Sequence, residues 1–197
     1  MSIGDPERAQ QLVLVRHGET AWSREGRHTG RTDVPLTELG REQARALRNA
    51  LQRWRFAAVY VSPLQRARDT CELAGYGDAA VVLPDLIEWD YGEYEGLTTM
   101  DVRRSRPGWN IWKDGTPGGE PLAAAGARAD RALALARRQQ GDVLLVAHGH
   151  ILRILTARWI DHPALLGQRF RLEPASPSVL SYEHEWTTVN AWNLSRD

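Results

Sequence analysis

An arginine and a histidine stand side by side where an apolar segment of the chain ends. Arg16 and His17 follow the run 12–15, Leu-Val-Leu-Val, and Gly18 comes next. A guanidinium group is planar and permanently charged, and it binds phosphate oxygens in pairs. An imidazole can attack phosphorus or carry a proton near neutral pH. This pair at the exit of a buried strand therefore predicts covalent phosphoryl transfer through a phosphohistidine.

A second histidine occupies the same kind of position later in the chain. His148 follows the apolar segment 142–147, and Gly149 follows it in turn. Ligands of open α/β sheets bind beyond the carboxyl ends of the strands. A glycine there lets backbone N–H groups approach an anion, and a helix that begins at this point adds a favourable dipole. If the two strands are neighbours, the two histidines meet at one site.

A third strand, predicted over 57–61, leads to a second arginine. We expect a helix to follow it with Ser62 as its cap and Pro63 in its first turn, and this helix carries Arg66. Fixed positive charge on the phosphoryl oxygens is the main catalytic lever in phosphoryl transfer. Two arginines and two histidines would provide it without a metal.

The remainder of the chain alternates apolar strands with amphipathic helices. This alternation predicts an α/β three-layer sandwich with a largely parallel central sheet. We expect a single domain over residues 1–197, with a lid-like insertion at about 88–121. The other predicted elements are helices over 38–54 (capped by Thr37), 98–106, 122–140 and 151–160, loops over 23–35 and 109–121, and strands over 81–83 and near 169–172, 179–182 and 188–192.

Composition narrows the class of partner. The chain has 25 basic and 25 acidic residues, and this balance argues against nucleic acid and membrane surfaces as partners. Cys71 is the only cysteine, which fits a reducing compartment. The polar start, residues 1–11, and the absence of an apolar run of about 18 residues predict a cytoplasmic protein. The sequence leaves a homodimer open.

Four motifs in a fixed order resemble the histidine phosphatase superfamily, in the branch that includes cofactor-dependent phosphoglycerate mutase. Segments near 88–96 and 109–115 are further similar to sedoheptulose-1,7-bisphosphatases and to small bacterial acid phosphatases. The resemblance implies the phosphoglycerate mutase-like fold. The four motifs are Leu14–Thr20, Ser62–Ala67, Leu86–Gly96 and Val146–Gly149.

The resemblance implies a role for each residue of the predicted site. His17 resembles the nucleophile that becomes phosphorylated, and Arg16 and Arg66 resemble the pair that clamps the phosphoryl oxygens. His148 resembles the second pocket histidine, which hydrogen-bonds the transferring group. Glu88 resembles the proton donor to the leaving alcohol.

The resemblance also implies substrate-binding positions around this centre. Ser23 and Thr29 fall at loop positions that face the phosphate, and Gly30 and Gly149 are expected to bind substrate with them. Neither a cofactor nor a metal is implied. A His-x-His pair such as His148 and His150 can bind a metal, but a strand-to-helix turn need not direct both side chains the same way.

Three functions remain open at this stage. The favoured one is a phosphatase acting on small phosphate monoesters, such as sugar phosphates. The alternatives are a 2,3-bisphosphoglycerate-dependent phosphoglycerate mutase and a non-catalytic module that binds phosphorylated ligands. A bisphosphorylated sugar would need a second cationic group, and the candidates for it are Arg27, Arg31, Arg103 and Lys113. Asp90 is a rival to Glu88 as the proton donor. His28 is a candidate for the rim of the pocket.

Overall fold

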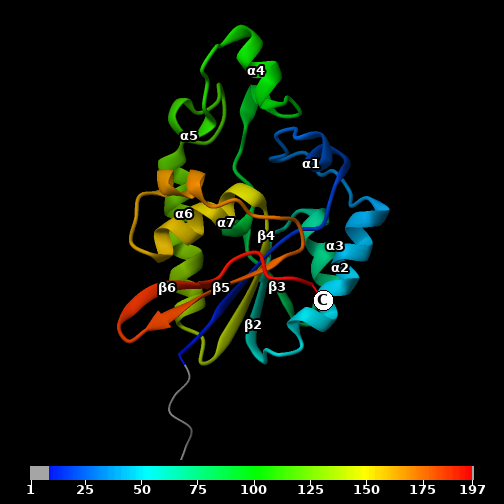
Figure 1. Ribbon diagram of the computed structural model, residues 1–197, viewed down its shortest axis with the longest axis vertical. Helices are drawn as coiled ribbons and strands as arrows, with labels where there is room; N and C mark the ends of the chain where they lie inside the picture. The colour runs from blue at the N-terminus through cyan, green and yellow to red at the C-terminus, as the bar shows by residue number, and fades with distance from the viewer. Residues whose placement is uncertain (1–8, 197) are drawn as a thin grey trace, which may run out of the picture.

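Six strands form one sheet in the order β3-β2-β4-β1-β5-β6 in the computed structural model, which describes residues 9–196 (Figure 1). The strands β3, β2, β4 and β1 run parallel, and β5 and β6 are antiparallel to their neighbours. The mostly parallel α/β sheet is therefore confirmed. The strands are β1 Leu12–Arg16, β2 Phe56–Val61, β3 Ala80–Val82, β4 Asp142–Ala147, β5 Pro177–Glu183 and β6 Trp186–Ala191.

Helices cover both faces of this sheet. In Figure 1, α2 and α3 lie on one side of it and α6 and α7 on the other. Side chains alternate between the faces of a strand. Leu12 and Leu14 accordingly belong to the core under α6 and α7, whereas Val13 and Val15 belong to the core under α2 and α3. The helices are α1 Ala21–Glu25, α2 Glu38–Leu51, α3 Gln65–Leu73, α4 Thr99–Ser105, α5 Ile111–Asp114, α6 Leu122–Arg137 and α7 Gly149–Trp159.

The sheet order places the three predicted site strands next to one another. β4 pairs with β1 on one side and with β2 on the other, in both cases in parallel. Parallel neighbours end at the same edge of a sheet, so the residues that follow these strands meet there. The insertion 88–121 carries α4 and α5, which extend beyond this edge at the top of Figure 1.

The turn after β1 packs tightly against α2. Thr37 caps this helix as predicted, because its hydroxyl accepts the N–H of Gly40 at 3.0 Å. A Cβ atom added to Gly18 would lie 2.3 Å from the carbonyl oxygen of Gly40. The glycines therefore let two backbones touch, and this contact fixes the loop that presents His17.

Two predictions about the elements are wrong. Ser62 does not cap α3, which begins at Gln65 after Leu64, and its hydroxyl instead bonds His148. No strand forms over 169–172; residues Ala164–Arg169 form a 3₁₀ helix instead. Within the predicted strand, the carbonyl of Leu172 accepts a hydrogen bond from the Arg16 side chain, so it is not free for a strand ladder.

Short helices occupy parts of two predicted loops. A capping box between Thr20 and Ser23 starts α1 at Ala21, and the helix extends to Glu25, so it overlaps the first three residues of the predicted loop 23–35. The Asn110 side chain accepts the N–H of Trp112 and starts α5. The helices predicted over 38–54 and 122–140 end earlier, at Leu51 and Arg137.

No helix among residues 9–196 is long and apolar enough to cross a membrane. The polar N-terminal segment, residues 1–11, is predicted to lack a signal sequence. Most of this segment, residues 1–8, lies outside the described residues. The single-domain prediction for 1–197 likewise includes residues 1–8 and 197, about which the structure gives no description.

Candidate active site

His17 lies at the carboxyl end of β1 with only 4% of its surface exposed. Its Nδ1 lies 2.7 Å from the carbonyl oxygen of Gly18. A carbonyl can only accept, so Nδ1 carries the proton and Nε2 is left as a free nucleophilic nitrogen. Burial, followed by the charges of Arg66 and Arg16, holds the pKa of His17 well below its ordinary value. The imidazole is therefore neutral, as an attack on phosphorus requires.

His148 lies directly after β4, and its ring centroid is 5.1 Å from that of His17. It is completely buried, and its Nε2 is 2.6 Å from the hydroxyl of Ser62 at the end of β2. Its Nδ1 is buried and has no partner. Burial, and next the charge of Arg66, lowers the pKa of His148 well below its usual range.

The two arginines bond backbone carbonyls of segments that are distant in the sequence. Arg16 donates from Nη1 to the carbonyl of Leu172 at 2.7 Å. Arg66 is completely buried and donates to three carbonyls of the loop after α1, those of Thr29, Gly30 and Thr32. For both arginines, desolvation by burial lowers the pKa from its ordinary value.

Four buried side-chain polar atoms among the described residues lack a hydrogen-bond partner. Three of them belong to the predicted site: Nε of Arg16, Nε of Arg66 and Nδ1 of His148. The fourth is Nε2 of His28. Buried polar atoms are nearly always bonded, and an orphan costs about 1–3 kcal/mol. Unpaired donors from two arginines next to His17 fit an oxyanion with several acceptor oxygens.

Glu88 is fixed between the insertion and α7. Its Oε1 accepts the N–H groups of Trp89 and Ile151, and its Oε2 accepts that of His150 at 3.0 Å. The carboxyl group is 4% exposed and faces the cavity. Its rival Asp90 instead accepts the N–H of Gly92 and does not line the cavity.

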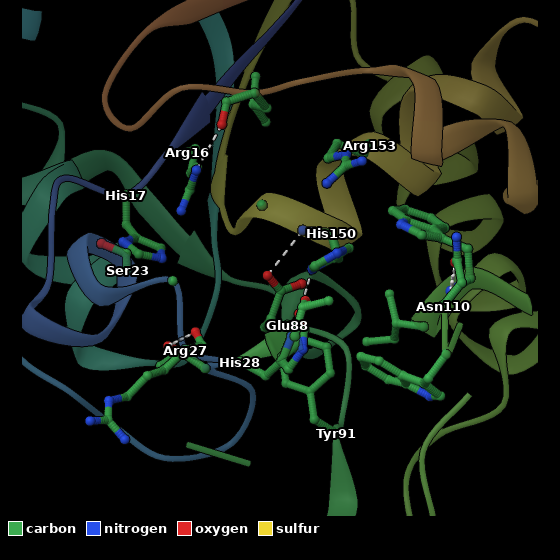
Figure 2. Close-up of a pocket in the computed structure, with 18 of the residues that line it drawn as sticks. Arg16, His17, Ser23, Arg27, His28, Glu88, Tyr91, Asn110, His150 and Arg153 are labelled. Carbon is green, nitrogen blue, oxygen red and sulfur yellow. Dashed lines mark hydrogen bonds between the residues drawn. The ribbon is translucent and has the colours of Figure 1, made fainter. Parts of the chain in front are cut away.

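A cavity of about 380 Å³ opens in front of His17 (Figure 2). Its walls come from the end of β1, the segment 23–29, the insertion and the first turns of α7. Arg16 and Glu88 face it directly, whereas Arg66 and His148 are buried and are not part of its lining.

The predicted substrate-binding loop residues have other partners. Ser23 lines the cavity, but its hydroxyl donates to the carbonyl of Thr20 and accepts the N–H of the same residue. Thr29 also lines the cavity, and its hydroxyl donates to the carbonyl of Arg27. Both hydroxyls thus act first in shaping the loop.

The two glycines differ in position. Gly149 lines the cavity beside Arg16. Gly30 does not line it, and its N–H donates to Oε1 of Glu95 at 2.8 Å. The prediction that Gly30 binds substrate is therefore corrected: its carbonyl holds Arg66, and its N–H is already bonded.

One cation of the cavity wall, Arg153 on α7, was not predicted from the sequence. It stands four residues after Gly149, so helical periodicity places both on the same helix face and could have revealed it. Of the candidates for a second cationic group, Arg27 and Arg103 line the cavity, and Arg31 and Lys113 do not. His28 lines the cavity and packs between Tyr91 and Trp109.

The ring of His150 is half-buried and packs in an aromatic cluster. Its Nδ1 lies 2.6 Å from the hydroxyl of Tyr91, and it packs against Trp89 and Trp112. Among residues 9–196, no group of three or more histidine, cysteine or acidic side chains is placed to hold a metal ion.

Comparisons with known proteins show the family of this chain. The family model of the histidine phosphatase superfamily, branch 1, matches residues 12–195. An acid phosphatase of Mycobacterium tuberculosis is 45% identical over 90% of this chain and 89% of its own. Sedoheptulose 1,7-bisphosphatase of Saccharomyces cerevisiae is 37% identical over 78% of this chain and 69% of its own. The solved structure of a functionally characterised Mycobacterium tuberculosis open reading frame superposes with a TM-score of 0.91, at 43% identity, covering 96% of this chain and all of the other.

Proposed function

This chain belongs to the histidine phosphatase superfamily and is a phosphatase, and from this premise we propose that it hydrolyses small phosphate monoesters through a phosphohistidine on His17. The observation that carries the proposal is the set of unpartnered buried donors on Arg16, Arg66 and His148. These donors lie around a neutral imidazole whose Nε2 is free of the proton, and His17 lines the cavity.

The first step transfers the phosphoryl group to the protein. Nε2 of His17 attacks phosphorus, an N–P bond forms, and the P–O bond to the alcohol breaks. Arg16 and Arg66 bind the phosphoryl oxygens and stabilise the charge on them as the bond breaks. The carboxyl group of Glu88 gives its proton to the leaving oxygen, so the alcohol departs neutral.

The second step returns the protein to its starting state. Glu88, now a carboxylate, takes a proton from a water molecule as the water oxygen attacks phosphorus. The N–P bond breaks, inorganic phosphate leaves, and Nε2 of His17 regains its lone pair. In this proposal the same carboxyl group acts as acid in the first step and base in the second.

The mutase alternative differs in the fate of the phosphoryl group. A mutase must return it to another oxygen of the substrate instead of to water. Resemblance to cofactor-dependent phosphoglycerate mutases implies a lysine for the substrate carboxylate at about the position of Thr99, and Thr99 lines the cavity. This position has a hydroxyl and no charge, which supports net hydrolysis.

A cytoplasmic location is also part of this proposal. Its support is the lone Cys71, which is buried in the core between α3 and the sheet. Burial raises the pKa of its thiol to about 12, so the thiol stays protonated and unreactive. The homodimer remains a prediction from the sequence.

The proposal is tested by trapping the intermediate. The wild-type protein is mixed with a phosphoryl donor labelled with ³²P, such as glycerol 3-phosphate, and the mixture is quenched in alkali. The protein should retain the label on histidine. His17→Ala should retain none and should lose at least about 10³-fold in kcat on p-nitrophenyl phosphate. His162→Gln, at an exposed histidine far along the chain, is the control. Full activity of His17→Ala would remove His17 from the mechanism.

A further inference from the structure

A cation stands on the cavity wall away from the predicted nucleophile. In Figure 2, His17 and Arg153 lie on opposite sides of the cavity, with Glu88 between them. Glu88 is the proposed donor to the leaving oxygen, so the side of the cavity beyond it receives the alcohol part of a substrate. Arg153 therefore faces that part of the molecule and not the transferred phosphoryl group.

The guanidinium of Arg153 is held in place without an acidic partner. It lies 4.8 Å from the centroid of the Trp112 ring. Its Nε donates to the carbonyl of Gly167 at 3.0 Å, and its Nη2 donates to that of Gln168 at 3.1 Å. Among residues 9–196, no carboxylate forms an ion pair with it, and its hydrogen bonds come from Nε and Nη2, which leaves Nη1 without a protein partner. The side chain is thus rigid and charged, and has a free donor.

His150 adds a second donor beside this cation. Burial, and next the charge of Arg153, lowers the pKa of His150 well below its ordinary value, so its ring is neutral and carries one proton. The hydroxyl of Tyr91 lies 2.6 Å from Nδ1 and has no other acceptor among the described groups. The hydroxyl therefore donates to Nδ1, and the ring proton is on Nε2. Nε2–H has no protein acceptor, and the residue lines the cavity.

The charge of the cavity lining favours a substrate with more than one anionic group. Four arginines line it, namely Arg16, Arg27, Arg103 and Arg153, and Glu88, the proposed proton donor, is the one acidic residue of the lining. Arg27 is paired with Glu25 outside the cavity at 2.6 Å. A bound phosphoryl group would engage Arg16, which leaves the positive charge at Arg153 uncompensated.

We propose that Arg153 and His150 form a second anion subsite, and that the preferred substrates are phosphate monoesters whose alcohol carries a further carboxylate or phosphate. The second anion accepts hydrogen bonds from Nη1 of Arg153 and from Nε2–H of His150. Tyr91 is a positioning residue, because its hydroxyl selects the tautomer of His150. The subsite rests on the proposed function, since it binds the part of the substrate that hydrolysis releases.

The first test compares matched substrates on the wild-type protein by phosphate release. One pair is 3-phosphoglycerate and glycerol 3-phosphate, which differ by a carboxylate; the other is fructose 1,6-bisphosphate and fructose 1-phosphate, which differ by a phosphate. We expect kcat/KM to favour the doubly anionic member of at least one pair by tenfold or more, mainly through KM. The pair that shows this preference identifies the second anion as carboxylate or phosphate.

Equal kcat/KM within both pairs would overturn the subsite while the phosphatase proposal stands. Absence of hydrolysis and of labelled His17 with every ester would overturn both.

The second test removes the cation. Arg153→Gln should lower the preference ratio of the favoured pair about tenfold or more, the loss expected for one charge-assisted hydrogen bond. The matched control is Arg137→Gln, because Arg137 also lies over a tryptophan, Trp159, at 4.6 Å but does not line the cavity. The control should keep the wild-type ratio.

An equal loss of kcat/KM on both members of the pair would assign Arg153 to structure alone and overturn the proposal. If Arg153→Gln does not fold, the same preference ratio is measured on Arg153→Lys, which keeps the charge but loses the planar guanidinium. The comparison of substrates on the wild-type protein tests the subsite without any variant.

Discussion

The hydroxyl of Ser62 lies 2.6 Å from Nε2 of His148, across the ends of two neighbouring parallel strands. The hydroxyl oxygen also accepts the N–H of Leu64, and its own hydrogen has no other acceptor among the described groups. The hydroxyl therefore donates to Nε2, and His148 carries its proton on Nδ1, the buried atom without a protein partner. Ser62 thus orients a donor toward the phosphoryl site.

Replacing Ser62 with alanine tests this relationship. Ser62→Ala frees the tautomer and ring orientation of His148, so kcat on p-nitrophenyl phosphate should fall about tenfold, the cost of roughly one such hydrogen bond. KM should change less, because both arginines remain. Ser181→Ala is the matched control, since Ser181 is also a buried serine, and its hydroxyl donates to the carbonyl of Gln10, far away in the sequence. Unchanged kcat in Ser62→Ala, with the fold intact by circular dichroism, would contradict the role.

Stability should decrease as the pH falls below about 6.5, the ordinary pKa of histidine. The pKa values of His17, His148 and His150 are well below this value in the folded protein, first because of burial and then because of nearby arginines. Between the folded and unfolded pKa values the unfolded chain binds more protons, so the free energy of unfolding rises with pH. This stabilisation is fully present above pH 6.5. It is lost progressively as the pH falls toward the lowered pKa values of the folded protein, at up to about 1.4 kcal/mol per histidine per pH unit.

Urea unfolding at pH 7.5 and pH 5.5, without phosphate, measures this dependence. His148→Gln should flatten it because one titrating group is removed, and His162→Gln should leave it unchanged because His162 is exposed. A free energy of unfolding that is equal or higher at pH 5.5 would refute the prediction.

Adding a methyl group to Gly18 should disrupt the turn that presents His17. Its Cβ would lie 2.3 Å from the carbonyl oxygen of Gly40, and neither backbone can move without shifting α2 or the turn. We expect Gly18→Ala to cost about 1–3 kcal/mol of unfolding free energy, as overpacking usually does, and to reduce activity as well. Gly149→Ala is the control for stability, because its nearest contact would be an ordinary 3.5 Å to Arg16. Equal urea midpoints for the two variants would show that the turn can adapt.

The sequence alone indicated the centre of the site and the fold class. Arg16, His17 and His148 follow apolar runs directly, so the strand exit that places each of them can be found from local pattern. The strand alternation likewise predicted a mostly parallel sheet, which the structure confirms. These features depend on short-range periodicity, which the sequence records directly.

The tertiary structure decided what depends on contacts between distant segments. That β4 lies between β1 and β2, and so brings Ser62 against His148, follows from strand pairing. The N–H of Gly30 is taken by Glu95, 65 residues away, and no local pattern reveals such a bond. Arg153 faces the cavity because α7 packs on the sheet with that face toward the insertion. The local sequence determines which residues follow each strand, whereas tertiary packing determines which groups their polar atoms bond.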